Sequence, residues 1–341
     1  MDALAGPLLS VRNVRKHFAG RRRIFGGRTT KIHAVDDVSF DIARGETFGL
    51  VGESGCGKST LARCIVRLME PSEGAVVFEG RDISHLSMQQ MRPLRRAMQL
   101  VFQDPIASLN PRRRVGSVLV EALRLNRIGT RATRPQLARE LFEKVGLSPH
   151  FFERFPNELS GGQRQRIGIA RALALGPRLM VADEPVSALD VSVRAEILNL
   201  LKDLQADLGL TMLFISHDLG VIRHISDRVG VMYLGRLVEL SPAEEFYRAP
   251  FHPYSEALLA AIPLPDPDAR FTRKQIVLEG DMPSPDAPPA GCRFNTRCLY
   301  ATDLCRTTEP PLTSYPGGRL AACHYPLNQE AEASISTTTN N

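Results

Sequence analysis

Residues 52–60 are the feature that most narrows what this 341-residue chain can fold into. They read GESGCGKST, match G-x-x-x-x-G-K-[S/T], and lie between an apolar run at 46–51 and a segment of helical spacing at 61–68. Glycines let consecutive backbone N–H groups turn inward around an anion, and a helix N-terminus adds partial positive charge. The sequence therefore predicts a phosphate-binding loop in an α/β domain. The expected cradle comprises Gly52, Glu53, Ser54, Gly55, Cys56, Gly57, Lys58, Ser59 and Thr60.

Two side chains of this loop have expected roles. Lys58 would place a mobile positive charge on the β- and γ-phosphates of a nucleotide, and Ser59 would offer a hydroxyl to Mg²⁺. Cys56 has no evident catalytic partner and is expected to be a small packing residue.

A second motif is the apolar run at 179–182 that ends in two acids, Asp183 and Glu184. Neighbouring side chains on a strand point to opposite faces, so the two carboxylates can do different work. We expect Asp183 to hold Mg²⁺ through water and Glu184 to act as the general base that polarises the attacking water. Two exposed acids at a strand end are the alternative, and the phosphate loop argues against it.

A third motif, LSGGQ at 159–163, lies between the other two and places a second glycine-rich turn at a helix start. With it the chain resembles the ATP-binding cassette (ABC) ATPases, whose signature motif has this sequence. The resemblance implies a RecA-like core with a helical subdomain. It also implies that the signature helix faces the γ-phosphate of ATP held by a second cassette. The residues assigned to that contact are Ser160, Gly161, Gly162 and Gln163.

Other family landmarks follow in order. Gln103 matches the residue that contacts Mg²⁺ or the attacking water and moves with the permease. Residues 187–190 (SALD) match the loop at the dimer seam, and His217 matches the histidine that touches the γ-phosphate. Phe18 is the expected aromatic for stacking on adenine. Phe25 is a competitor for that role, and strand packing is the alternative for Phe18.

Two segments make the resemblance more specific. Residues 182–193 (ADEPVSALDVSV) and 250–255 (PFHPYS) look like the ATPases of bacterial dipeptide and oligopeptide importers. The similarity runs from about residue 8 to residue 327. It implies a heterodimer of two ATPase chains, two membrane permease subunits, an extracytoplasmic substrate-binding protein, and a peripheral place on the cytoplasmic face of the plasma membrane. The cargo stays open among dipeptides, oligopeptides, glutathione and nickel complexes.

The expected organisation has three parts. An ATPase domain spans 8–248, with the helical subdomain at about 104–175, and an extension spans 249–327. The polar tail 328–341 has the composition of a disordered segment. Seven prolines between 263 and 290 indicate a linker or an extended arm. Alternating strand and helix patterns predict a right-handed, doubly wound sheet.

Four cysteines gather in the extension with the spacing C-x5-C-x6-C-x17-C: Cys292, Cys298, Cys305 and Cys323. Four thiols in a short proline-rich segment suggest a metal that stabilises it, although the spacing is not that of a zinc ribbon. Resemblance to peptide-importer ATPases implies a [4Fe–4S] cluster. Zinc and free or partly paired thiols stay open, as does His324 as an alternative ligand.

The charge distribution supports one rival function. The chain has 43 basic and 37 acidic residues, and residues 1–31 hold eight basic groups against Asp2 alone. Such an arm can bind nucleic acid, so a soluble cassette acting on nucleic acid or ribosomes is the alternative. An arginine-rich insertion at 19–31 near the nucleotide or the dimer seam explains the charge equally well. No uncharged stretch exceeds ten residues, so we expect no transmembrane helix. The short apolar run at 3–9 is followed, not preceded, by basic residues, so we expect no signal peptide.

Overall fold

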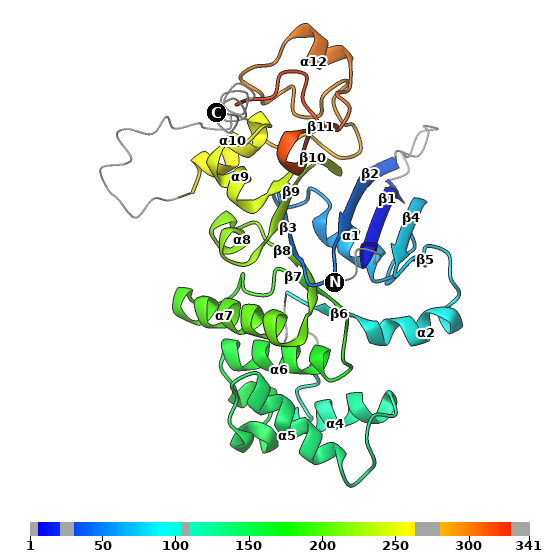
Figure 1. The fold of residues 1–341 in the computed structure, drawn as a ribbon, viewed down its shortest axis with the longest axis vertical. Helices are drawn as coiled ribbons and strands as arrows, with labels where there is room; N and C mark the ends of the chain where they lie inside the picture. The colour runs from blue at the N-terminus through cyan, green and yellow to red at the C-terminus, as the bar shows by residue number, and fades with distance from the viewer. Residues whose placement is uncertain (1–5, 21–30, 104–108, 263–279, 329–341) are drawn as a thin grey trace, which may run out of the picture.

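The computed structural model describes residues 6–20, 31–103, 109–262 and 280–328 (Figure 1). Phe25, most of the arginine-rich insertion, most of the proline-rich stretch and nearly all of the polar tail lie outside these residues. The expectations for these segments therefore stay predictions. No helix in the described part combines the length and apolar character that crossing a membrane requires.

The first layer is an antiparallel sheet near the N-terminus, with strand order β2-β1-β4-β5. Its strands are β1 (Leu9–Ala19), β2 (Lys31–Ile42), β4 (Glu73–Phe78) and β5 (Arg81–Asp82). Alternating apolar residues at 8–18 and 32–42 favour the first two as strands. Their assembly into a separate sheet was not expected, because alternation shows that one face is buried but not which strands pair.

The second layer is an eight-stranded sheet of order β11-β12-β10-β9-β3-β8-β7-β6. Five neighbouring strands run parallel: β9 (Arg228–Tyr233), β3 (Thr47–Val51), β8 (Thr211–Ile215), β7 (Leu179–Asp183) and β6 (Met98–Val101). Every residue of β3, β7 and β8 is buried, as expected for parallel strands covered on both faces. The carboxyl ends of these strands meet at one edge and bring the predicted motifs together.

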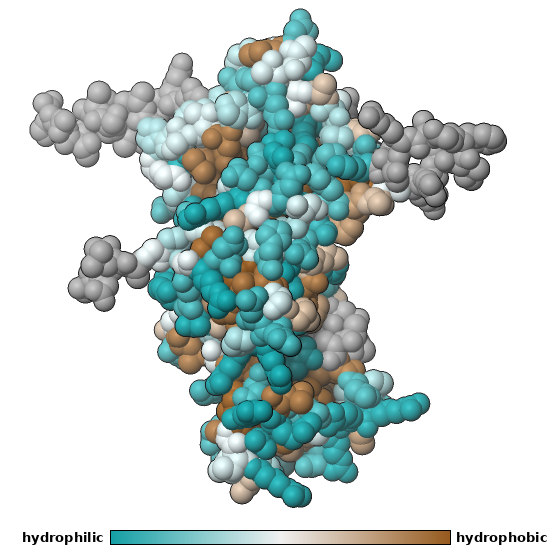
Figure 2. Space-filling model, turned by 90° about the vertical axis from the view of Figure 1, so that its right-hand side faces the viewer, coloured by the Kyte–Doolittle hydropathy of each residue, from teal (hydrophilic) through white to brown (hydrophobic). Residues whose placement is uncertain are grey.

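Helices cover this sheet and build one end of the molecule (Figure 1). Three of them, α4 (Val115–Leu125), α5 (Arg134–Lys144) and α6 (Gly161–Leu173), pack together in the region predicted to be a helical subdomain. Figure 2 shows hydrophobic residues among hydrophilic ones on this lower part of the surface. The other helices are α1 (Lys58–Ile65), α2 (Met88–Ala97), α7 (Val191–Leu208), α8 (Leu219–Ile225), α9 (Ala243–Arg248), α10 (Pro253–Ala260) and α12 (Asp303–Thr307).

The C-terminal extension is joined to the main sheet. Its strands β11 (Thr313–Tyr315) and β12 (Arg319–Ala321) continue the sheet beyond β10 (Arg236–Pro242), with Glu239 of β10 opposite Ala321. Glu239 is fully buried and accepts hydrogen bonds from the backbone N–H groups of Phe251 (2.9 Å) and His252 (2.8 Å). The Arg319 guanidinium lies 3.4 Å from the centre of the Phe251 ring. The extension therefore shares a core with the cassette.

His252 fixes the start of α10. It is 1% exposed, and its Nδ1 accepts a hydrogen bond from the Tyr254 N–H at 3.0 Å. Burial lowers the pKa of His252 from 6.5 to about 3, so the imidazole is neutral in the folded protein.

This burial predicts a pH-dependent stability. Because the folded-state pKa lies below the unfolded one, the contribution of neutral His252 is complete above pH 6.5 and is lost as the pH falls toward 3. Between pH 7 and pH 5 the free energy of unfolding should drop by about 2 kcal/mol from this group. His252→Asn keeps a capping acceptor and removes the titration. Unfolding followed across this range should show a smaller decline for the variant; parallel curves would contradict the assignment.

Candidate nucleotide site

The phosphate loop has a backbone that only glycine can adopt at its key positions. Gly52, Gly55 and Gly57 have φ values of 150°, 82° and 109°. A Cβ on Gly52 would lie 2.1 Å from the Met232 carbonyl oxygen, and one on Gly57 would lie 2.0 Å from that of Ala34. The loop backbone thus packs against β9 at Gly52 and against β2 at Gly57, and neither position has room for a side chain.

Lys58 holds its charge inside this loop. Lys58 is only 4% exposed, and its Nζ donates to the carbonyl oxygens of Gly52 (2.7 Å) and Glu53 (2.9 Å). Cys56 Sγ lies 3.6 Å from Nζ, and burial raises the pKa of this thiol. A neutral packing role for Cys56 is consistent with that environment. A largely buried ammonium beside backbone N–H groups favours an anionic ligand.

Ser59 and Asp183 form a pair of oxygen donors beside the loop. The Ser59 hydroxyl donates to Asp183 Oδ1 at 2.8 Å. Burial raises the pKa of Asp183, while this hydrogen bond opposes the increase. A hydroxyl and a carboxylate next to a phosphate cradle are the donor types that Mg²⁺ takes when it is shared with a nucleotide. The residues present therefore fit this metal.

Glu184 points to a different group from its neighbour Asp183. It follows β7 with φ 49°, and its Oε2 lies 3.2 Å from His217 Nδ1 and 3.2 Å from Gln103 Nε2. Gln103 also lies 3.4 Å from the Ser187 hydroxyl. Its hydrogen bonds therefore go toward Glu184 rather than toward Ser59 and Asp183. An amide donor and an imidazole hold the carboxylate at the cavity wall, as a positioned base requires.

One cavity of about 270 Å³ joins these groups. The loop, Gln103 and Glu184 line it together, as the motif order predicts. Three further lining residues were not predicted: Ile32 and Ala34 of β2, and Pro285 of the extension. The Pro285 carbonyl accepts a hydrogen bond from the His33 N–H at 3.0 Å. No motif marks these residues, because they are brought to the site by packing alone.

The signature residues cap α6. The Ser160 hydroxyl accepts from the Gln163 N–H at 3.3 Å, and the Gln163 side chain accepts from the Ser160 N–H at 3.0 Å. Gly162 leaves room for Val193, whose Cγ1 would lie 2.4 Å from a Cβ there, and Gly161 faces Leu189. Among the described residues that line the cavity, none belongs to this motif. Its contact with a nucleotide stays a prediction.

Phe18 lies next to the cavity. It is half-buried near the end of β1, opposite the cavity residue Ile32, and Lys16 Nζ is 5.4 Å from its ring centre. This position suits a residue that meets the base of a nucleotide, and the stacking role stays a prediction.

The four cysteines of the extension line one small pocket, which also contains His324. All are free thiols. Burial raises the pKa of Cys292 to about 11 and that of Cys323 to about 12, so these thiols are neutral without a metal. His324 Nε2 is hydrogen-bonded to the Thr308 carbonyl at 2.9 Å, which leaves Nδ1 as its free ring nitrogen.

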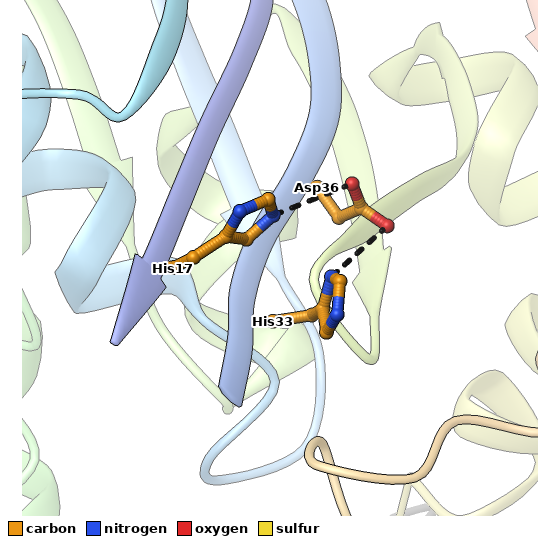
Figure 3. A group of neighbouring side chains, drawn as sticks. All are labelled: His17, His33 and Asp36. Carbon is orange, nitrogen blue, oxygen red and sulfur yellow. Dashed lines mark ion pairs between the residues drawn. The ribbon is translucent and has the colours of Figure 1, made fainter. Parts of the chain in front are cut away.

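Within the described residues, only one group of three ligand atoms lies mutually within 4.8 Å: His17, His33 and Asp36 (Figure 3). Both imidazoles face the Asp36 carboxylate, at 3.8 and 3.9 Å. Although burial opposes it, neighbouring guanidinium groups hold the pKa of Asp36 below its ordinary value. Because three guanidinium groups already neutralise this carboxylate, we interpret the group as a structural cluster. They belong to Arg15, Arg236 and Arg293.

Comparisons with known proteins agree with this geometry. The family model for ABC transporters matches residues 35–187, and that for the C-terminal region of oligopeptide/dipeptide transporters matches residues 238–305. A Brucella ovis peptide import ATP-binding protein is 56% identical over 317 residues, covering 93% of this chain and 97% of the relative. The oligopeptide transport ATP-binding protein AppF of Bacillus subtilis is 50% identical over 318 residues, covering 93% and 97%.

Solved structures support the same fold. The ATP-binding cassette MJ0796, in a dimeric post-hydrolysis state with ADP and Pi, matches with a TM-score of 0.61 and 31% identity. The match covers 69% of this chain and 98% of that one. CbiO1 from Clostridium perfringens also has a TM-score of 0.61, at 28% identity over 71% of this chain and 91% of its own. This chain therefore belongs to the ABC transporter family, as an ATPase of the peptide import ATP-binding protein group.

Proposed function

We propose that this chain is the ATP-hydrolysing subunit of an importer for dipeptides or oligopeptides. One observation carries the proposal: the phosphate loop, Gln103 and Glu184 line one cavity, and Asp183 is hydrogen-bonded to the lining residue Ser59, in a chain whose extension matches the oligopeptide/dipeptide transporter model. Relatives named for peptide import support the cargo class. They do not support the nucleic-acid alternative, whose basic arm lies largely outside the described residues.

The residues divide the work of hydrolysis. Lys58 and the inward N–H groups bind the β- and γ-phosphates, while Ser59 and Asp183 would hold Mg²⁺. Bound Mg²⁺ would neutralise charge on the phosphates. Glu184 accepts a proton from the attacking water, whose oxygen bonds to the γ-phosphorus as the bond to the bridging β–γ oxygen breaks. His217 and Gln103 orient the Glu184 carboxylate.

A second cassette completes the site in this proposal. Ser160 and Gly162 stand at the start of α6, away from the cavity lined by their own phosphate loop. A helix N-terminus with a capped first turn suits an anion brought by another chain. Residues 160–163 thus bind the γ-phosphate in trans. The dimeric form of the related cassette supports this arrangement.

The remaining partners follow from the proposed role. The second cassette is a different ATPase chain, and two permease subunits and an extracytoplasmic binding protein complete the importer. The chain lies on the cytoplasmic face of the membrane. Gln103 and the helical region carry the closing motion to the permease, and residues 104–108 between them lie outside the described residues. The domain division at residue 249 is part of the same proposal.

We also propose a [4Fe–4S] cluster on Cys292, Cys298, Cys305 and Cys323, which share one pocket. Four thiolates can hold either a cluster or zinc, and the shared pocket is compatible with both. The resemblance to peptide-importer ATPases is what selects the cluster in this proposal.

Glu184→Gln tests the proposed base. Turnover should fall by about a hundredfold or more, because the amide cannot accept the proton. Nucleotide binding should persist, since Lys58 and the loop are intact, and a closed dimer should accumulate in MgATP. Steady-state hydrolysis and size-exclusion chromatography with the partner cassette measure both effects. Glu196→Gln, an exposed carboxylate on α7, is the matched control. Hydrolysis by Glu184→Gln at the control's rate would exclude Glu184 as the base.

The cluster has its own test. Protein purified without oxygen should contain iron and sulfide at about four of each per chain and absorb visible light. Cys323→Ser should lower both contents, whereas Cys64→Ser, at a buried thiol in α1, should not. Metal analysis and absorption spectra give the result. Zinc in place of iron, or no metal at all in the anaerobic protein, would refute the cluster.

A further inference from the structure

The extension contacts the phosphate loop directly, at Glu53. The Glu53 backbone N–H donates to the Tyr254 hydroxyl oxygen at 2.9 Å. Arg297 Nη1 lies 2.9 Å from Glu53 Oε2, and the Arg297 side chain is only 8% exposed. Both the peptide and the side chain of the second loop residue are thus held by residues of the C-terminal extension.

A buried cluster of three aromatic rings supports these two contacts. The Tyr254 ring packs against Tyr233 and Phe294, with ring centres 4.7 and 5.3 Å apart. Tyr233 and Phe294 are themselves 5.2 Å apart. All three rings are buried. The Arg297 backbone N–H donates to the Phe294 carbonyl oxygen at 3.0 Å, which ties the arginine to the aromatic cluster.

The extension meets the loop and its surroundings at two further points. A Cβ on Gly55 would lie 3.6 Å from Met282 Cε, so this methyl group covers the loop. Pro285 lines the nucleotide cavity and bonds to β2 through its carbonyl. Residues of the segment 280–298 therefore contact the loop at Gly55 and Glu53 and line the cavity at Pro285.

Anchoring of this kind changes nucleotide affinity. A loop that must present its N–H groups inward loses conformational freedom on binding, and that cost is smaller when the loop is already held in shape. A largely buried, charge-assisted hydrogen bond such as Arg297–Glu53 holds it more firmly than a neutral one. Glu53 directly follows Gly52, whose φ of 150° is accessible to glycine but rarely to other residues.

We propose that Arg297 and Tyr254 are positioning residues for the phosphate loop, supplied by the C-terminal extension and acting through Glu53 on ATP affinity. The inference rests on the proposed binding of the triphosphate at residues 52–60. It gives the tyrosine of the PFHPYS segment a role in the nucleotide site, besides its place in α10.

The test measures binding of a fluorescent ATP analogue with Mg²⁺ to the full chain. Arg297→Met removes the charge and keeps the aliphatic stem, and it should raise the Kd by about tenfold. Tyr254→Phe should raise it by a smaller factor. KM for ATP should rise in both variants with kcat at saturating ATP nearly unchanged. Arg297→Lys should recover part of the loss, because it retains the charge without the planar fork.

Matched variants separate positioning from general loosening of the extension. Arg293→Met removes a second largely buried arginine of the same segment, 10% exposed, which pairs with Asp36 rather than with the loop. Tyr300→Phe removes a hydroxyl that bonds Glu256. Both should leave the Kd within about twofold of the wild-type value, even where the melting temperature falls. Equal weakening by Arg293→Met and Arg297→Met would overturn the proposal.

A double-mutant cycle with Glu53→Gln tests the route. Arg297→Met should add clearly less than its full loss in the Glu53→Gln background, because the amide has no charge to pair with the guanidinium. A full additional loss, or wild-type affinity of Arg297→Met, would refute the inference. Lys58→Ala distinguishes this failure from that of the nucleotide site itself. If Lys58→Ala binds nucleotide normally, residues 52–60 are not the site; if it alone loses binding, only the positioning role fails.

Discussion

The phosphate loop lies against backbone carbonyl groups of two strands, one from each sheet, and the geometry of the site depends on this contact. The loop runs from Gly52 to Gly57 with its backbone against Met232 of β9 and Ala34 of β2, where no side chain fits. Each contact fixes a peptide orientation that other residues would resist. The loop can therefore adopt its phosphate-binding conformation without a ligand. Lys58, the next residue, donates hydrogen bonds to the loop carbonyls of Gly52 and Glu53.

The parallel sheet adds the chemistry to that shape. Because β3, β6, β7 and β8 end at one edge, residues far apart in sequence reach one cavity without a long loop. Asp183 is the last residue of β7, and Glu184 follows it with φ 49°, so the two acids point to different groups. Asp183 turns to the Ser59 hydroxyl, and Glu184 turns to His217 and Gln103. The end of β7 thus gives the proposed metal ligand and the proposed base separate partners.

Much of this was predictable from sequence, because glycine patterns and strand ends are local features. The loop, the two acids at the end of β7 and the cap at Ser160 lie where their motifs indicate. Contacts across the chain were not predictable. Tyr254 is hydrogen-bonded to Glu53, 201 positions away in sequence. Strand β12 of the extension pairs with β10 of the main sheet. The apolar run of β9 could have been recognised as a strand, but its antiparallel partner β10 could not have been assigned from period alone.

If hydrolysis depends on a second cassette, turnover per chain must depend on protein concentration. With the partner chain in equal amount, the rate per chain should climb as the two associate and level off once they are paired. It should stay low in dilute solution, where each loop faces water instead of a signature helix. A rate per chain that does not change with dilution, down to concentrations where only monomers exist, would contradict the account.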